Sequence, residues 1–99
     1  MPIMMMTTPT LLQSNTSANN LCILVVDDEE SLCRLISDTL DSYGYRVLAA
    51  GSVEEAHALF GVHRDEVALL VSDVVMPGGS GPELFKEFRR QTPDLRALF

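Results

Sequence analysis

Three aspartates stand where apolar runs end, which is an unusual place for ionisable side chains. Asp27 and Asp28 directly follow the run at 23–26, and Asp73 directly follows the run at 67–72. Carboxylates that lie close together repel one another unless a cation lies among them. Hard divalent cations prefer oxygen ligands, and Mg²⁺ is the common choice where phosphate is involved. The three residues therefore indicate a Mg²⁺ site, provided that the fold brings them together.

An acidic pair that holds Mg²⁺ beside a third carboxylate is a setting for phosphoryl transfer. The metal ion neutralises charge on the phosphoryl oxygens and lets an anionic nucleophile approach. An aspartate can be that nucleophile, and the product is then an aspartyl phosphate. Pro77 and the small residues at 78–81 follow, so the backbone can bend around such a site.

The elements that must position these aspartates alternate between apolar runs and amphipathic segments. The runs at 21–26, 45–50 and 67–72 predict strands, and 95–99 starts a fourth. Apolar residues recur at helical spacing in 28–43, after Ser52 and after Pro82, so three helices are predicted. Proline at position 82 suits the first turn of the third helix. Ser52 is the expected N-cap of the second helix, with Glu55 at the capping-box position.

Alternation of strands and helices predicts βαβ units, a parallel sheet and right-handed crossovers. In a doubly wound sheet of order 2-1-3-4, the first and third strands are neighbours and the winding direction reverses between them. Ligands bind at that switch point, beyond the carboxyl ends of the strands. We therefore expect Asp27, Asp28 and Asp73 to converge in one crevice. Asp27 alone could also serve as a helix cap.

Composition limits the classes of protein that the chain can belong to. The 99 residues carry a net charge of −7, which argues against binding to nucleic acid or to an anionic membrane surface. No apolar run approaches the roughly 20 residues of a membrane-spanning helix. Residues 1–20 contain no charged side chain and predict a disordered tail, so the domain is expected at 21–99. Cys22 and Cys33 are interpreted as small buried hydrophobes in a reducing compartment, and we expect a cytoplasmic protein.

Taken together, ILVVDDEE and the later DVVMPGGSG resemble the receiver domain of bacterial response regulators, and PDLRALF resembles receivers of hybrid histidine kinases. The resemblance covers residues 21–99 and implies a flavodoxin-like α/β fold. It also implies a signalling module, not an enzyme, in a two-component phosphorelay. By this resemblance Asp73 accepts a phosphoryl group from the phosphohistidine of a sensor histidine kinase. Asp27, Asp28 and Asp73 hold Mg²⁺, together with the backbone carbonyl of Val75.

The chain also departs from that family. Receivers have five strands and five helices, whereas this sequence stops within its fourth strand. The family's Ser or Thr at the end of strand four and its lysine at the end of strand five have no counterpart. Lys86, the only lysine, falls in a predicted helix. We therefore expect a C-terminally truncated receiver that lacks the last helix-strand-helix and can self-associate through the edge strand at 95–99.

Two alternative functions remain open at this point. One is a truncated receiver-like module, or gene fragment, that takes no phosphate and acts only by binding. The other is a Mg²⁺-dependent phosphohydrolase with an aspartate nucleophile, a class that places a second acid two residues further on, where this chain has Val75. The upstream glycine-rich motif of a P-loop nucleotidase is absent from the sequence.

Three further polar residues have simpler interpretations. His57 is expected on a partly exposed helix surface and not as a phosphohistidine. Arg89 and Arg90 are expected at a solvated helix end, where cations interact favourably with the helix dipole.

Overall fold

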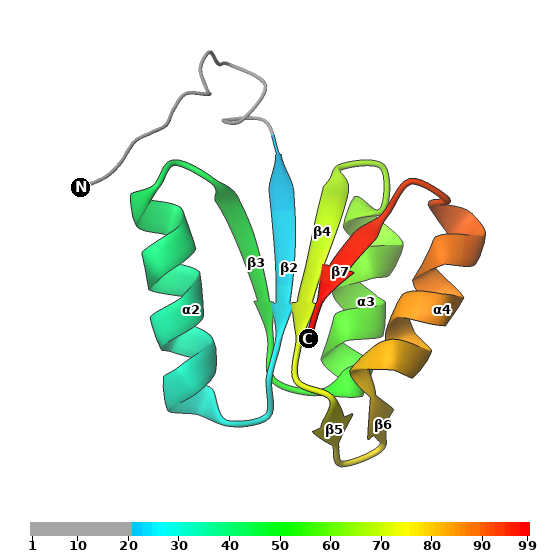
Figure 1. The fold of residues 1–99 in the computed structure, drawn as a ribbon, viewed down its shortest axis with the longest axis horizontal. Coiled ribbons are helices and arrows are strands. Elements are labelled where there is room, and N and C mark those ends of the chain that lie inside the picture. Colours follow the sequence, from blue (N-terminus) through cyan, green and yellow to red (C-terminus); the bar gives the residue numbers. More distant parts are fainter. Residues whose placement is uncertain (1–20) are drawn as a thin grey trace.

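The computed structural model of the protein describes residues 21–99, which form a parallel sheet with helices on both faces (Figure 1). The tail predicted at residues 1–20 lies outside the described residues. The elements follow in the order β2 (Cys22–Val26), α2 (Glu30–Ser42), β3 (Arg46–Ala50), α3 (Val53–His63), β4 (Val67–Ser72), β5 (Val75–Met76), β6 (Gly79–Ser80), α4 (Gly81–Gln91) and β7 (Arg96–Leu98).

The main sheet has the strand order β3-β2-β4-β7, and every pair in it is parallel. Counted along the chain, this is the predicted order 2-1-3-4, so the predicted doubly wound topology is confirmed. Strands β2 and β4 are direct neighbours, with Val26 paired to Ser72 at their carboxyl ends. The winding direction reverses between these two strands, and their ends therefore form the switch point.

The helices bury the two faces of the sheet against different apolar clusters. Helices α3 and α4 lie on one face, where the rings of Phe60 and Phe88 stack at a centroid distance of 4.0 Å over the central strands. Helix α2 covers β2 and β3 on the other face, where Cys33 packs with Ile23 and Val25. Strand β2 is buried on both faces, which explains its uninterrupted apolar sequence.

Side chains at the helix ends explain where α3 and α4 begin. The Oγ atom of Ser52 accepts a hydrogen bond from the Glu55 amide at 3.0 Å, as the capping pattern predicts. The Glu55 carboxylate accepts from the Gly51 amide at 2.6 Å, one residue earlier than a capping box requires. Ser80 caps α4 in the same way by accepting from the Glu83 amide at 3.2 Å, which satisfies one of the free amides of the first turn.

A short antiparallel hairpin, β5 and β6, connects β4 to α4 and was not predicted. Its turn consists of Pro77 and Gly78, and Gly78 has a φ of 88° that favours glycine. Proline followed by glycine suits a type II turn. Strands of two residues are too short to produce an alternating apolar pattern, so sequence periodicity could not reveal them.

No helix within residues 21–99 combines the length and the apolar character needed to span a membrane.

Helix α4 begins at Gly81, which lies close to the end of β4. A Cβ atom at this position would lie 2.4 Å from the Asp73 carbonyl oxygen and 2.7 Å from the Ser72 Oγ atom. The first neighbour is backbone, which cannot rotate out of the way. Glycine is therefore required here for lack of space and not for an unusual φ.

We predict that Gly81→Ala destabilises the fold by about 1–3 kcal/mol, because the added methyl overpacks the contact between α4 and β4. The matched control is Gly61→Ala in α3, where an added Cβ meets nothing within 4 Å. This control should stabilise the fold by about 0.5–1 kcal/mol through helix propensity. Urea unfolding followed by circular dichroism measures both changes. Equal effects of the two substitutions would contradict the close approach at Gly81.

Candidate functional site

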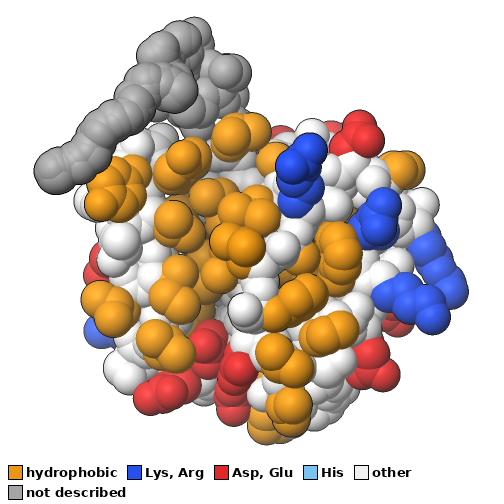
Figure 2. Space-filling model, viewed as in Figure 1, with side chains coloured by type: hydrophobic (Ala, Val, Ile, Leu, Met, Phe, Trp, Pro, Cys, Tyr) orange, Lys and Arg blue, Asp and Glu red, His pale blue; other side chains and the backbone are white. Residues whose placement is uncertain are grey.

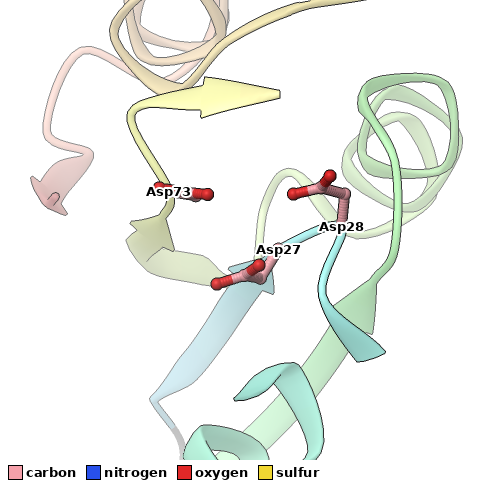
Figure 3. Close-up of side chains that lie close together, drawn as sticks. All are labelled: Asp27, Asp28 and Asp73. Atoms are coloured by element: carbon pink, nitrogen blue, oxygen red, sulfur yellow. The ribbon is translucent and has the colours of Figure 1, made fainter. Parts of the chain in front are cut away.

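Three aspartate side chains converge beyond the carboxyl ends of β2 and β4 (Figure 3). Asp27, Asp28 and Asp73 each offer a carboxylate oxygen, and these oxygens all lie within 4.8 Å of one another. Asp27 is buried, whereas Asp28 and Asp73 are exposed. The predicted convergence of the three residues in one crevice is confirmed.

Backbone hydrogen bonds fix two of these aspartates to the sheet. The Asp27 amide donates to the Ala50 carbonyl at 3.1 Å, and the Asp73 amide donates to the Val26 carbonyl at 3.1 Å. Both bonds continue the parallel ladder just past the last paired residues. The positions of Asp27 and Asp73 are therefore set by the register of the sheet and not by a free loop.

Side-chain hydrogen bonds orient the same two carboxylates. The Asp27 Oδ1 atom accepts from the Glu29 amide at 2.9 Å, and the Asp73 Oδ1 atom accepts from the Val74 amide at 2.8 Å. The N-cap of α2 is Glu29. Asp27 therefore stabilises the turn before the helix, and the interpretation of Asp27 as a helix cap is wrong.

The donor set fits a hard divalent cation. All three groups offer oxygen and no nitrogen or sulfur, which favours Mg²⁺ or Ca²⁺ over softer metals. Two oxygens on one Mg²⁺ lie at most about 4.2 Å apart, since each is about 2.1 Å from the ion. Oxygens gathered within 4.8 Å need only a small adjustment to reach that arrangement.

A cavity of about 580 Å³ adjoins the two aspartates that follow β2, between α2 and the end of β3. Arg34 and Cys33 are among its lining residues. The Cys33 thiol contacts the Ala50 carbonyl at 3.8 Å, and desolvation on burial raises its pKa above the ordinary value. Cys33 therefore remains a protonated thiol at neutral pH, in agreement with its interpretation as a small buried hydrophobe.

The predicted fourth ligand, the carbonyl of Val75, belongs to strand β5, two residues beyond Asp73. The Val75 side chain is exposed, and the residue pairs with Ser80 in the hairpin. Its role as a ligand stays a prediction.

Sequence reasoning missed the contribution of Ser72 to the site. This residue is buried, and its Oγ atom donates to the Asp73 carbonyl at 2.9 Å, the same oxygen that excludes a side chain at position 81. Its polar side chain at the end of an apolar run was the available signal.

His57 lies on the exposed surface of α3, as predicted. Its Nε2 atom is 3.2 Å from a carboxylate oxygen of Glu87 on α4, and its ring packs edge-on against Phe88. His57 is therefore a surface residue whose side chain links α3 to α4.

Comparison with known proteins agrees with this arrangement of residues. The family model described as the response regulator receiver domain matches residues 23–99. Sensor kinase CckA of Brucella abortus (strain 2308) is 39% identical over 77 residues, covering 78% of this chain and 8% of that protein. Transcriptional regulatory protein CpxR of Klebsiella pneumoniae is 44% identical over 73 residues, covering 72% of this chain and 30% of that protein. The chain thus spans less than a third of either relative.

Among solved structures, the response regulator protein TrrA of Thermotoga maritima, in complex with Mg²⁺-BeF, superimposes with a TM-score of 0.70. Its sequence is 35% identical, and the match covers 78% of this chain and 65% of that one.

The acidic site is expected to bind Mg²⁺ weakly, because it is open and the ion keeps several of its waters. Titration with Mg²⁺ should shift the NMR signals of residues at the ends of β2 and β4. Asp28→Asn should weaken binding by roughly tenfold or more, since ligand charge sets affinity. Asp41→Asn, at an exposed position of α2, is the control with the same charge change and should leave affinity unchanged. Shifts confined to Glu29 and Glu30 would contradict the site.

Proposed function

Since the chain belongs to the response regulator receiver family, we propose that it is a phosphoacceptor module of a two-component phosphorelay. Asp73 receives the phosphoryl group from a phosphohistidine of a sensor histidine kinase, with Mg²⁺ as cofactor. The observation that carries this proposal is the convergence of Asp27, Asp28 and Asp73 within 4.8 Å at the switch point of the sheet.

The geometry at Asp73 suits a nucleophile. One carboxylate oxygen accepts from the Val74 amide, and the exposed side chain leaves the other oxygen accessible. That oxygen attacks phosphorus opposite the histidine nitrogen. The new P–O bond forms as the P–N bond breaks, and the imidazole leaves with the electron pair of the broken bond.

The two aspartates that follow β2 would serve as metal ligands in this reaction. The buried carboxylate of Asp27 is held by the Glu29 amide, whereas Asp28, the next residue, is exposed. Asp27, Asp28 and Asp73, with the Val75 carbonyl, would hold Mg²⁺, which neutralises charge on the phosphoryl oxygens. The Mg²⁺-BeF complex of the related TrrA protein supports this choice of cofactor.

A second candidate function is a binding module that takes no phosphate. Within residues 21–99, no Lys or Arg side chain is ion-paired with any of the three aspartates. Lys86, the only lysine, lies on the exposed surface of α4. Without a Lys or Arg side chain of residues 21–99 beside the phosphoryl group, phosphoryl transfer to Asp73 would be slow.

The proposal of a phosphoacceptor module also implies a partner and a cellular location. Its partner is a sensor histidine kinase or the phosphohistidine domain of one, and its place is the cytoplasm, where Cys22 and Cys33 remain free thiols. It acts as a signalling module and not as an enzyme.

Incubation with acetyl phosphate and Mg²⁺ is expected to label Asp73 slowly. Asp73→Asn should abolish labelling, and Asp28→Asn should reduce it because the metal site loses a ligand. Asp65→Asn, at an exposed position after α3, is the control and should label like the unchanged protein. Intact-mass spectrometry at low temperature measures the phosphorylated fraction. Labelling that survives Asp73→Asn would refute Asp73 as the acceptor, and no labelling of the unchanged protein would favour the binding module.

We also propose that the chain self-associates through residues 95–99. Strand β7 pairs only with β4 in the described sheet, so its outer edge offers unpaired backbone groups. Leu98 and Phe99 are more than half exposed. Figure 2 shows hydrophobic side chains gathered over the middle of the sheet face on which α2 lies. No helix of residues 21–99 covers β4 and β7 on this face.

Sedimentation velocity over a range of concentrations is expected to show this association. Leu98→Lys should raise the dissociation constant by roughly tenfold or more, because lysine on an edge strand opposes pairing. Val62→Lys, at an exposed apolar position on α3, adds the same charge away from that edge. A monomer at all concentrations, or an equal effect of both substitutions, would exclude this interface.

A further inference from the structure

Positive charge is concentrated on one helix of an otherwise acidic protein. The chain has 14 acidic and 7 basic residues, yet three of the seven lie within a single stretch of α4, at Lys86, Arg89 and Arg90. All three are exposed. Cations at the end of a helix interact favourably with its dipole, which accounts for Arg89 and Arg90 in the last turn. Lys86 lies one turn before Arg90, and this spacing of like charges disfavours the helix, so the dipole does not explain the whole group.

These three cations surround a groove that contains no carboxylate. The groove has a volume of about 380 Å³ and is lined by Phe85, Lys86, Arg89, Arg90 and Pro93. Phe85 and Pro93 supply apolar surface between the basic side chains. Lys86 and Arg90 also line a second groove, toward α3, which includes Glu83 and Glu87. The groove beside Phe85 and Pro93 is therefore the one of these two whose lining contains no carboxylate.

The basic side chains of this groove are free of ion pairs within residues 21–99. Arg34 and Arg46 pair with Glu30 and Glu66, but Lys86, Arg89 and Arg90 take part in no such pair. Glu87, the acid next to Lys86, instead lies beside His57.

One of the cations is already held in place. The Arg89 guanidinium lies 5.4 Å from the centre of the Phe85 ring and donates to the Pro93 carbonyl at 3.5 Å. The Phe85 ring also packs edge-on against Phe99. These contacts fix the guanidinium at the side of the groove, so less conformational entropy is lost when it binds a ligand.

We propose that this groove binds an acidic peptide segment of a partner protein. One apolar side chain of the peptide packs between Phe85 and Pro93, and flanking carboxylates pair with Lys86, Arg89 and Arg90. Arginine favours this class of ligand, because its planar guanidinium can bind a carboxylate through two parallel hydrogen bonds. Complementary charge would also speed the encounter with an acidic partner.

A nucleic acid is a poorer match for the same groove. The net charge of −7 repels a polyanion over long range, and the basic surface extends over little more than one helical turn. A short acidic peptide can reach the three cations without facing the acidic remainder of the surface. The groove shares no residue with the aspartate site, so this proposal does not depend on phosphoryl transfer.

A fluorescein-labelled synthetic peptide, with glutamates flanking a central leucine, tests the proposal by fluorescence anisotropy. Binding to the full chain at low ionic strength is expected, and it should weaken as salt is added. Arg90→Glu and Lys86→Glu should each weaken binding by roughly tenfold or more. Arg34→Glu on α2 makes the same charge change at another exposed position and should alter binding by less than about twofold. A peptide with glutamines in place of the glutamates should not bind.

NMR signals of the unchanged protein locate the peptide, and signals of Phe85, Arg89 and Arg90 should shift. Circular dichroism of each variant verifies that it is folded, and the milder Lys86→Gln should still weaken binding. Equal losses for Arg34→Glu and Arg90→Glu, shifts at the aspartates instead, or no binding would each overturn the proposal. It would also be overturned if single-stranded nucleic acid bound in place of the peptide. Loss of self-association in Arg90→Glu, without peptide binding, would assign the groove to a second copy and overturn the proposal as well.

Discussion

The parallel pairing of β2 with β4 is the constraint on which the acidic site depends. These strands are neighbours although a helix, a strand and another helix separate them along the chain, and Val26 pairs with Ser72 at their ends. Asp27 and Asp73 each lie one residue beyond that pair, and both amides continue the ladder. A slip of one residue in this register would turn one carboxylate to the opposite face of the sheet. The apolar residues of β2 and β4 therefore determine where the carboxylates lie.

Acidic and basic groups lie on different parts of the fold. The acidic residues of the site lie at the carboxyl edge of the sheet, whereas three cations lie together on the exposed side of α4. Phe60 and Phe88 join α4 to α3 from the opposite side of the helix. Helix α4 thus packs into the core with one side and presents basic side chains on another, away from the acidic site.

Much of the fold and of the site could be predicted because both follow from strong local patterns. Apolar runs indicate the four main strands, and topology rules alone place Asp27 and Asp73 at adjacent strand ends. The β5–β6 hairpin could not be predicted, since a strand of two residues, such as Val75–Met76, is too short to show an alternating apolar pattern. The contact of Gly81 with the Asp73 carbonyl depends on how α4 sits against β4, and the groove beside Phe85 depends on how Pro93 turns the chain. Such features require three-dimensional packing and have no signature in a single sequence.

The two ladder bonds at Asp27 and Asp73 have a kinetic consequence for the site. An amide proton in a parallel ladder exchanges with solvent only when the strands around it separate, so its exchange reports the opening of the sheet. The carboxylates of Asp28 and Asp73 are exposed to water throughout, whereas the backbone that carries Asp73 is held by the Val26 carbonyl. The site is therefore accessible and yet slow to rearrange. A ligand can therefore reach the carboxylates without any opening of the sheet, while the spacing of the aspartates persists for as long as β2 and β4 remain paired.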